Sequence, residues 1–75
     1  MPLTLVKPGE RSMIQKIGGK EEQRKFLETL GFVIGTNVTV VNQMNGNVIV
    51  NVKESRVAIS KEMAGKIMVR VEESI

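Results

Sequence analysis

The stretch that decides the fold runs from residue 38 to residue 52 and reads VTVVNQMNGNVIVNV. Val38 and Val40 share a face of one expected strand, and valines again occupy every second position after the Asn45-Gly46 pair. Asn-Gly is the strongest short hairpin signal, because a type I′ turn needs positive φ at both central residues. The stretch therefore predicts two antiparallel strands joined by a tight turn, with Met44 at its rim.

The alternation continues toward the C-terminus. A second reversal at Lys53-Glu54 would join residues 48–52 to a strand over 55–59. Neither turn residue favours positive φ, so we expect a bulge or a longer loop there. Ser60 is a natural N-cap for one helical turn closed by Gly65, and residues 66–72 form the last expected strand.

The N-terminal part begins with a turn at Pro8-Gly9, because Pro presets φ at the second turn position and Gly accepts positive φ at the third. A first strand is expected over 12–17, although its alternation is imperfect because Ile14 falls on the face opposite Met13 and Ile17. Gly18-Gly19 ends this strand.

The period changes over residues 20–30. Phe26, Leu27 and Leu30 are spaced by three and four, which places them on one stripe of a helix. Gly31 can take the left-handed conformation that ends a helix, with Phe32 as the apolar residue after it. We expect both phenylalanines to belong to the core.

These elements predict a single domain over residues 1–75 that is mainly β with one helix, an α+β protein. The fold would be a small β-barrel of about five strands, with the main helix after the first strand and a short helical turn before the last. The apolar composition agrees, because 11 Val and 7 Ile outnumber 4 Leu and 2 Ala.

Composition also excludes several classes of function. The 75 residues include no Cys, His or Asp, so the commonest catalytic bases and metal ligands are missing. The eight carboxylates are all Glu, and the adjacent pairs Glu21-Glu22 and Glu72-Glu73 would point apart rather than toward one ion. We expect no enzyme, no metal site and no cofactor. With no signal peptide and no apolar run long enough to span a bilayer, we expect a cytoplasmic protein.

Three pieces of the chain together resemble the bacterial ferrous-iron transport protein A (FeoA) family. The matching residues are Leu5, Gly9, Glu10, Ile14 and Ile17; then Arg24, Leu27, Leu30, Gly31, Phe32, Gly35, Val38 and Val40; then Val57 through Ala64, Ile67 and Val69. Each piece alone is mostly glycine and aliphatic, but their order and spacing cover almost the whole chain. The family commonly has Pro where Ile34 stands, which loosens the turn before Gly35.

The resemblance implies an SH3-like barrel and a non-enzymatic, cytoplasmic accessory role in ferrous iron uptake. The implied partner is the cytoplasmic GTPase part of a membrane ferrous iron transporter (FeoB-like), whose assembly, opening or GTP turnover this protein would regulate. No direct membrane insertion is implied, although the partner would hold the protein at the inner face of the membrane. Exposed edge strands would permit, without requiring, a weak homodimer.

A partner surface is expected on the helix and the loop rim. The residues chosen for it are Arg24, Lys25, Met44, Arg56 and Lys61. Arginine is a frequent interface anchor, and an exposed Met adapts to a partner's shape. Arg24 and Arg56 are also the candidates for an arginine supplied to the partner's GTPase site.

The alternative is a small basic barrel that binds nucleic acid. It is supported by a net charge of +3 and a pI near 9.6. Against it, the basic residues are scattered, and the sequence offers no Tyr or Trp for stacking on bases. We therefore expect a protein partner and no nucleic acid.

Overall fold

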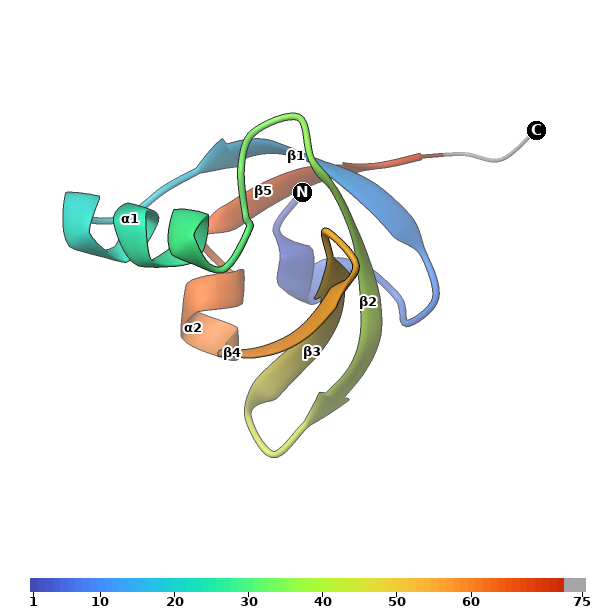
Figure 1. Ribbon diagram of the computed structural model, residues 1–75. Coiled ribbons are helices and arrows are strands. Elements are labelled where there is room, and N and C mark those ends of the chain that lie inside the picture. Colours follow the sequence, from blue (N-terminus) through green and yellow to red (C-terminus); the bar gives the residue numbers. More distant parts are fainter. Residues whose placement is uncertain (73–75) are drawn as a thin grey trace.

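The computed structural model describes residues 1–72, which form one five-stranded antiparallel sheet curled around a core (Figure 1). The elements are η1 (Leu3–Leu5, a 3₁₀ turn), β1 (Arg11–Ile17), α1 (Glu21–Thr29), β2 (Asn37–Met44), β3 (Asn47–Val52), β4 (Ser55–Ser60), α2 (Lys61–Ala64) and β5 (Ile67–Val71). The strand order is β4-β3-β2-β1-β5. The predicted SH3-like α+β barrel is confirmed, with α1 after the first strand and α2 before the last.

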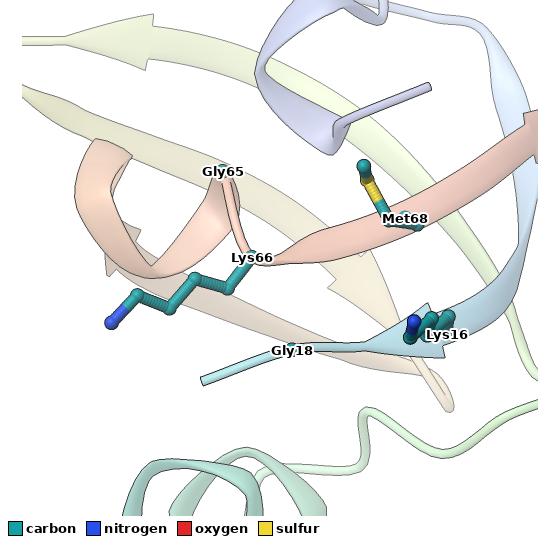
Figure 2. Close-up of a pocket in the computed structure, with 5 residues that line it drawn as sticks. All are labelled: Lys16, Gly18, Gly65, Lys66 and Met68. Atoms are coloured by element: carbon teal, nitrogen blue, oxygen red, sulfur yellow. The ribbon is translucent and has the colours of Figure 1, made fainter. Parts of the chain in front are cut away.

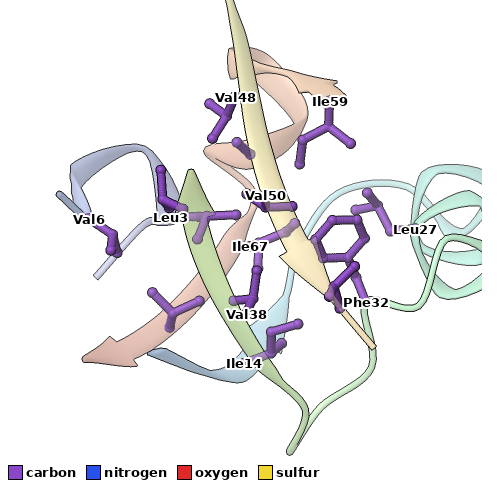
Figure 3. Packing of buried hydrophobic residues seen from close by; sticks show 14 residues of the cluster. Leu3, Val6, Ile14, Leu27, Phe32, Val38, Val48, Val50, Ile59 and Ile67 are labelled. Carbon is purple, nitrogen blue, oxygen red and sulfur yellow. The ribbon is translucent and has the colours of Figure 1, made fainter. Parts of the chain in front are cut away.

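The core consists of the inward faces of the strands, closed by residues from η1, α1 and the loop after α1 (Figure 3). Valines from β2 and β3 line it, as the alternating pattern predicts. Leu3, Leu27 and Phe32 enter from outside the sheet and are fully buried. Burying apolar surface is the main favourable term in folding, so these side chains hold the barrel together.

Two β-bulges interrupt the strand pairing, and the one in β1 explains why the apolar residues of that strand do not alternate regularly. The register of β1 on β5 shifts between Ile14 and Lys16, and that of β2 on β3 shifts between Val40 and Asn42. A bulge adds one residue to one strand, so side chains after it change face. Ile14 and Ile17 therefore both reach the core, and Lys16 points out.

The two hairpin turns have the same length but different chemistry. Asn45 and Gly46 both have positive φ, as predicted for this pair. Lys53 and Glu54 also have positive φ, at 47° and 65°, and Val52 pairs directly with Ser55. The tight reversal is confirmed, but the expected bulge or longer loop was wrong. The β3–β4 ladder imposes a left-handed turn on two residues that disfavour it.

The end of α1 follows the prediction closely. Gly31 has φ of 106°, its N–H bonds Glu28 O at 2.9 Å, and the Phe32 N–H bonds Leu27 O at 2.9 Å. This is the Schellman arrangement, and it directs Phe32 into the core. Phe26 is the error in the sequence interpretation, because 51% of it is exposed. Helix α1 contacts the barrel through a narrow face that includes the buried Leu27, and Phe26 lies beside that face.

The N-terminal segment covers one edge of the sheet. Residue Met1 exchanges two hydrogen bonds with Val69 of β5, at 2.9 and 2.7 Å, and Pro2 forms a bridge with Met68. At the end of β4, the Ser60 side chain caps α2 by accepting a hydrogen bond from the Met63 N–H at 3.2 Å, as predicted. The edge strand β5 is thus paired on both sides, whereas β4 pairs with β3 alone among the described residues.

Candidate interaction surfaces

The five residues predicted to contact a partner come from three parts of the fold. Arg24 and Lys25 lie on the exposed side of α1, where Lys25 forms an ion pair with Glu21 at 3.4 Å. Because both of those side chains are more than two-thirds exposed, this pair contributes little to stability. The helix surface carries nearly balanced charge, since Glu21, Glu22 and Glu28 offset its basic residues.

Met44 and Lys61 both lie near the β2–β3 hairpin. The Lys61 N–H donates to Gly46 O at 2.9 Å, which ties the start of α2 to the turn. About half of the Met44 side chain is exposed beside that turn. An exposed Met suits contact with a protein, since the thioether adapts its shape.

Arg56 belongs to the outer face of β4, near the β3–β4 hairpin. Its Nε donates to Asn51 Oδ1 at 3.4 Å, a long bond at the solvent-exposed surface. The Lys53 side chain of the same hairpin lies over Gly31 at the end of α1. The structure therefore separates the five predicted residues into α1, the β2–β3 hairpin with α2, and the face of β4.

A pocket lies where none of these residues contribute. It has a volume of about 300 Å³ and is lined by Lys16, Gly18, Gly65, Lys66 and Met68 (Figure 2). Lys16 lies near the end of β1 and Gly18 directly follows that strand, whereas Gly65 and Lys66 precede β5 and Met68 lies near its start. Sequence reasoning missed this pocket because it depends on how β1 pairs with β5. The available signal was the broken alternation before Gly18.

One lysine of the pocket is held in place by an uncharged group. Lys66 Nζ donates to Gln23 Oε1 at 2.8 Å, and the same oxygen accepts the N–H of Lys20 at 3.2 Å. Gln23 thereby links the start of α1 to the start of β5. The Lys66 stem passes over Gly19, where an added Cβ would lie 2.9 Å from Lys66 Cδ. Position 19 thus accommodates the lysine by having no side chain.

The carboxylates are distributed over the fold rather than gathered. Glu21 and Glu28 lie on α1, Glu54 in a hairpin turn, and Glu72 follows β5, where it approaches Arg11 at 3.7 Å. Within residues 1–72, no three His, Cys, Asp or Glu side chains come close enough together to hold a metal ion. No helix in the same range is long and apolar enough to cross a membrane.

The fold and its surfaces define a class of protein: a small SH3-like barrel, with an apolar core and its charged residues at the surface. The family model described as "FeoA domain" matches residues 1–71. The chain therefore belongs to the FeoA family, and the resemblance found in the sequence is confirmed.

Relatives in sequence and structure agree with that membership. A protein of Methanocaldococcus jannaschii named "Putative Fe(2+) transport protein A" is 37% identical over 68 residues, which cover 91% of this chain and 83% of that protein. A crystal structure described as an iron uptake regulatory protein (FeoA) is 33% identical, with a TM-score of 0.89 and 96% of each chain covered.

More distant structures share the fold alone. The solution structure of the FeoA protein from Chlorobium tepidum is 23% identical, with a TM-score of 0.88 over 95% of this chain and 70% of that one. IdeR from T. acidophilum is also 23% identical, with a TM-score of 0.86 over 96% of this chain but 34% of its own. The same barrel therefore occurs within much longer proteins.

Proposed function

We propose that this chain is a non-enzymatic accessory protein of ferrous iron uptake. The observation that carries the proposal is the FeoA family match over residues 1–71, together with a 37% identical relative named for Fe(2+) transport. The composition supports a role without catalysis, because the chain offers no Cys, His or Asp.

The protein would act by contact with the cytoplasmic GTPase part of a membrane ferrous iron transporter, which would place it at the inner face of the membrane. The structure offers surfaces for such a contact. Met44 with Lys61, Arg24 with Lys25, and Arg56 are all exposed. Exposed arginine and methionine side chains are chemically suited to protein contacts, so they support this mode of action.

The direct test is a calorimetric titration of the full chain into the GTPase-bearing cytoplasmic part of the transporter from the same cell. It is run without nucleotide and with a non-hydrolysable GTP analogue. The proposal expects saturable binding whose affinity depends on the nucleotide. Absence of binding in both states, and to the detergent-solubilised whole transporter, would overturn it. A steeply salt-dependent affinity for an oligonucleotide would instead favour the nucleic-acid alternative.

Regulation of GTP turnover is the finer part of the proposal. Arg24 and Arg56 are the side chains that could stabilise negative charge in the partner's active site. Each is exposed, and the one side-chain bond of Arg56 within residues 1–72 is its long bond to Asn51. Replacing either by Ala should then lower any stimulation of GTP hydrolysis, whereas Arg11→Ala at the start of β1 serves as the matched control. Unchanged turnover in both variants would remove this idea while leaving the accessory role intact.

A further inference from the structure

The outer face of β1 and β5 carries a pocket with two lysines and an apolar wall. Lys16 lies directly opposite Met68 across the β1–β5 pair, and the Gly18 N–H donates to Lys66 O at 2.7 Å. Alternate residues of a strand share a face, so Lys16, Gly18, Lys66 and Met68 all look outward on one surface. Figure 2 shows Gly18 between the two lysines, with Lys16 on the side of Met68 and the Lys66 side chain extending away from both.

The backbone of β1 is shaped to present Lys16 here. Without the register shift between Ile14 and Lys16, strict alternation from the buried Ile14 would turn Lys16 into the core. The bulge turns it outward and places it beside Met68. Two residues later, Gly18 adds no side chain, so the backbone between the two lysines remains accessible to a ligand.

Both ammonium groups keep their charge available. An ammonium has three donors, and Lys66 uses one of them on the neutral amide oxygen of Gln23. Neither Lys16 nor Lys66 forms an ion pair within residues 1–72, whereas Arg11 and Lys25 do. Lys66 is thus held in position without being neutralised, although Glu21 and Glu22 stand immediately before Gln23 in the helix. This is the arrangement expected for a cation that meets an external anion.

The wall of the pocket narrows the class of ligand. Met68 is 40% exposed, and the half-exposed Met1 lies at the neighbouring edge, since Pro2 bridges to Met68. A bare inorganic anion would leave this apolar surface uncovered. A nucleic acid would need a longer track of basic residues and aromatic side chains for its bases. A protein segment with a carboxylate next to an aliphatic side chain fits both parts of the surface.

We propose that this pocket binds an acidic side chain of the partner protein, with Lys16 pairing with the carboxylate, Lys66 adding positive charge on the other side of Gly18, and Met68 packing against the apolar neighbour of the acidic residue. The proposal rests on the proposed function, because it names the chemistry of the contact made with the transporter. It adds a contact at the β5 edge of the sheet, separate from Arg56 on β4 and from the β2–β3 hairpin.

The first experiment tests the pocket without the transporter. The ¹⁵N-labelled full chain is titrated with the peptide acetyl-Leu-Glu-Leu-amide and, as the matched control, acetyl-Leu-Gln-Leu-amide. Saturable amide shifts at Gly18, Gly65, Lys66 and Met68 with the glutamate peptide, and much weaker ones with the glutamine peptide, are expected. The proposal would be overturned if the amide shifts were absent, if they were equal for the two peptides, or if they were spread over the amides of all the basic residues.

Inorganic phosphate and a short single-stranded DNA are added as separate titrations. Phosphate binding as tight as the glutamate peptide would show a plain anion site rather than a protein contact. Tighter binding of the DNA, centred on the same amides, would assign the pocket to nucleic acid. Either result would overturn the proposal as stated, because Met68 would then have no role.

The second experiment uses paired variants in the transporter titration. Lys16→Met/Lys66→Met removes both charges and keeps the apolar stems, and Lys7→Met/Lys53→Met removes two charges elsewhere on the exposed surface. The first variant should weaken binding about tenfold relative to the second, which corresponds to about 1.4 kcal/mol. Equal affinity of the two variants overturns the pocket and leaves the accessory role standing. No binding of the wild type rejects the role, and the peptide titration still decides the pocket.

Thermal unfolding separates these effects from damage to the fold. Lys66→Met loses the bond to Gln23 and could loosen the start of α1. Lys16→Met alone breaks no side-chain bond recorded within residues 1–72, so it provides a second test at wild-type stability. It should weaken binding of the glutamate peptide by itself, and full retention of affinity would count against the proposal.

Discussion

The barrel wall and helix α1 differ in how much of their apolar surface they bury. In β2 and β3, five valines are at most 1% exposed, and the strands pair along their length with one bulge. In α1, Leu27 alone is fully buried, and the larger Phe26 is 51% exposed. The barrel therefore supplies the stability, whereas α1 is attached by one buried side chain, its Schellman end and the Gln23–Lys66 bond.

This difference indicates which surfaces of the molecule are available for contact with another protein. Surfaces on α1, the hairpin turns and the outer faces of the strands can change without emptying the core. If stability divides between the barrel and the helix in this way, substitutions in the barrel core should cost most and those on the exposed side of α1 least.

Truncation inside the wall should have the largest effect. Ile14 is fully buried on β1, so Ile14→Ala should destabilise the protein by about 2–5 kcal/mol through lost burial and the cavity left behind. Urea unfolding followed by circular dichroism measures the change. A loss below about 1 kcal/mol would mean that the wall carries less of the stability than the burial indicates.

A substitution at the junction between α1 and the barrel should have the second-largest effect on stability. Gly31 has φ of 106°, and a Cβ there would meet Lys53 and Val52 only at ordinary contact distances of 3.6–3.8 Å. Gly31→Ala should therefore cost about 1–2 kcal/mol, mainly from the left-handed backbone. The same urea experiment reports it, and faster amide exchange of Phe32 would locate it. A neutral substitution would contradict the assignment of the helix end.

The second hairpin turn should be open to improvement. Glu54 has φ of 65°, a backbone conformation that glycine adopts readily and that costs energy for a residue with a Cβ. Glu54→Gly should therefore stabilise the protein by about 1 kcal/mol. Gly46→Ala, in the other turn, is the opposite control: its Cβ would meet open space, and it should lose a similar amount. Thermal midpoints that move in the same direction for both variants would refute the strain argument.

The smallest effect is expected on the exposed side of the helix. Phe26→Ala removes a large aromatic side chain, yet it should change stability by no more than about 0.5 kcal/mol because half of that side chain is already exposed. Urea unfolding beside Leu27→Ala gives the contrast, since Leu27 is fully buried and should cost several times more. Equal losses at the two positions would show that Phe26 packs on the barrel.

Local signals made much of the fold predictable. Asn45-Gly46, the Gly31 helix end and the Ser60 cap each depend on neighbours in sequence, and each is found as expected. The turn at Lys53-Glu54 and the exposure of Phe26 were misjudged, because tertiary pairing fixes the first and the narrow docking of α1 fixes the second. The cover that Met1 gives to β5 had no sequence signal.

The candidate site was less predictable than the fold for the same reason. Composition correctly placed Arg24, Lys25, Met44, Arg56 and Lys61 at the surface, but it could not show that they lie in separate regions. The pocket between Lys16 and Lys66 needs the β1 bulge and a pairing between strands about fifty residues apart. Neither can be obtained from the spacing of residue types.

The most direct test of the account maps the contact itself. The ¹⁵N-labelled full chain is mixed with the unlabelled GTPase-bearing cytoplasmic part of the transporter, and amide shifts and line broadening are followed residue by residue. The account predicts that changes centre on Lys16, Gly18, Lys66 and Met68, while the buried valines of β2 and β3 keep their native positions. A spectrum that does not change, or changes centred on Arg24 and Arg56 with the pocket unaffected, would contradict it.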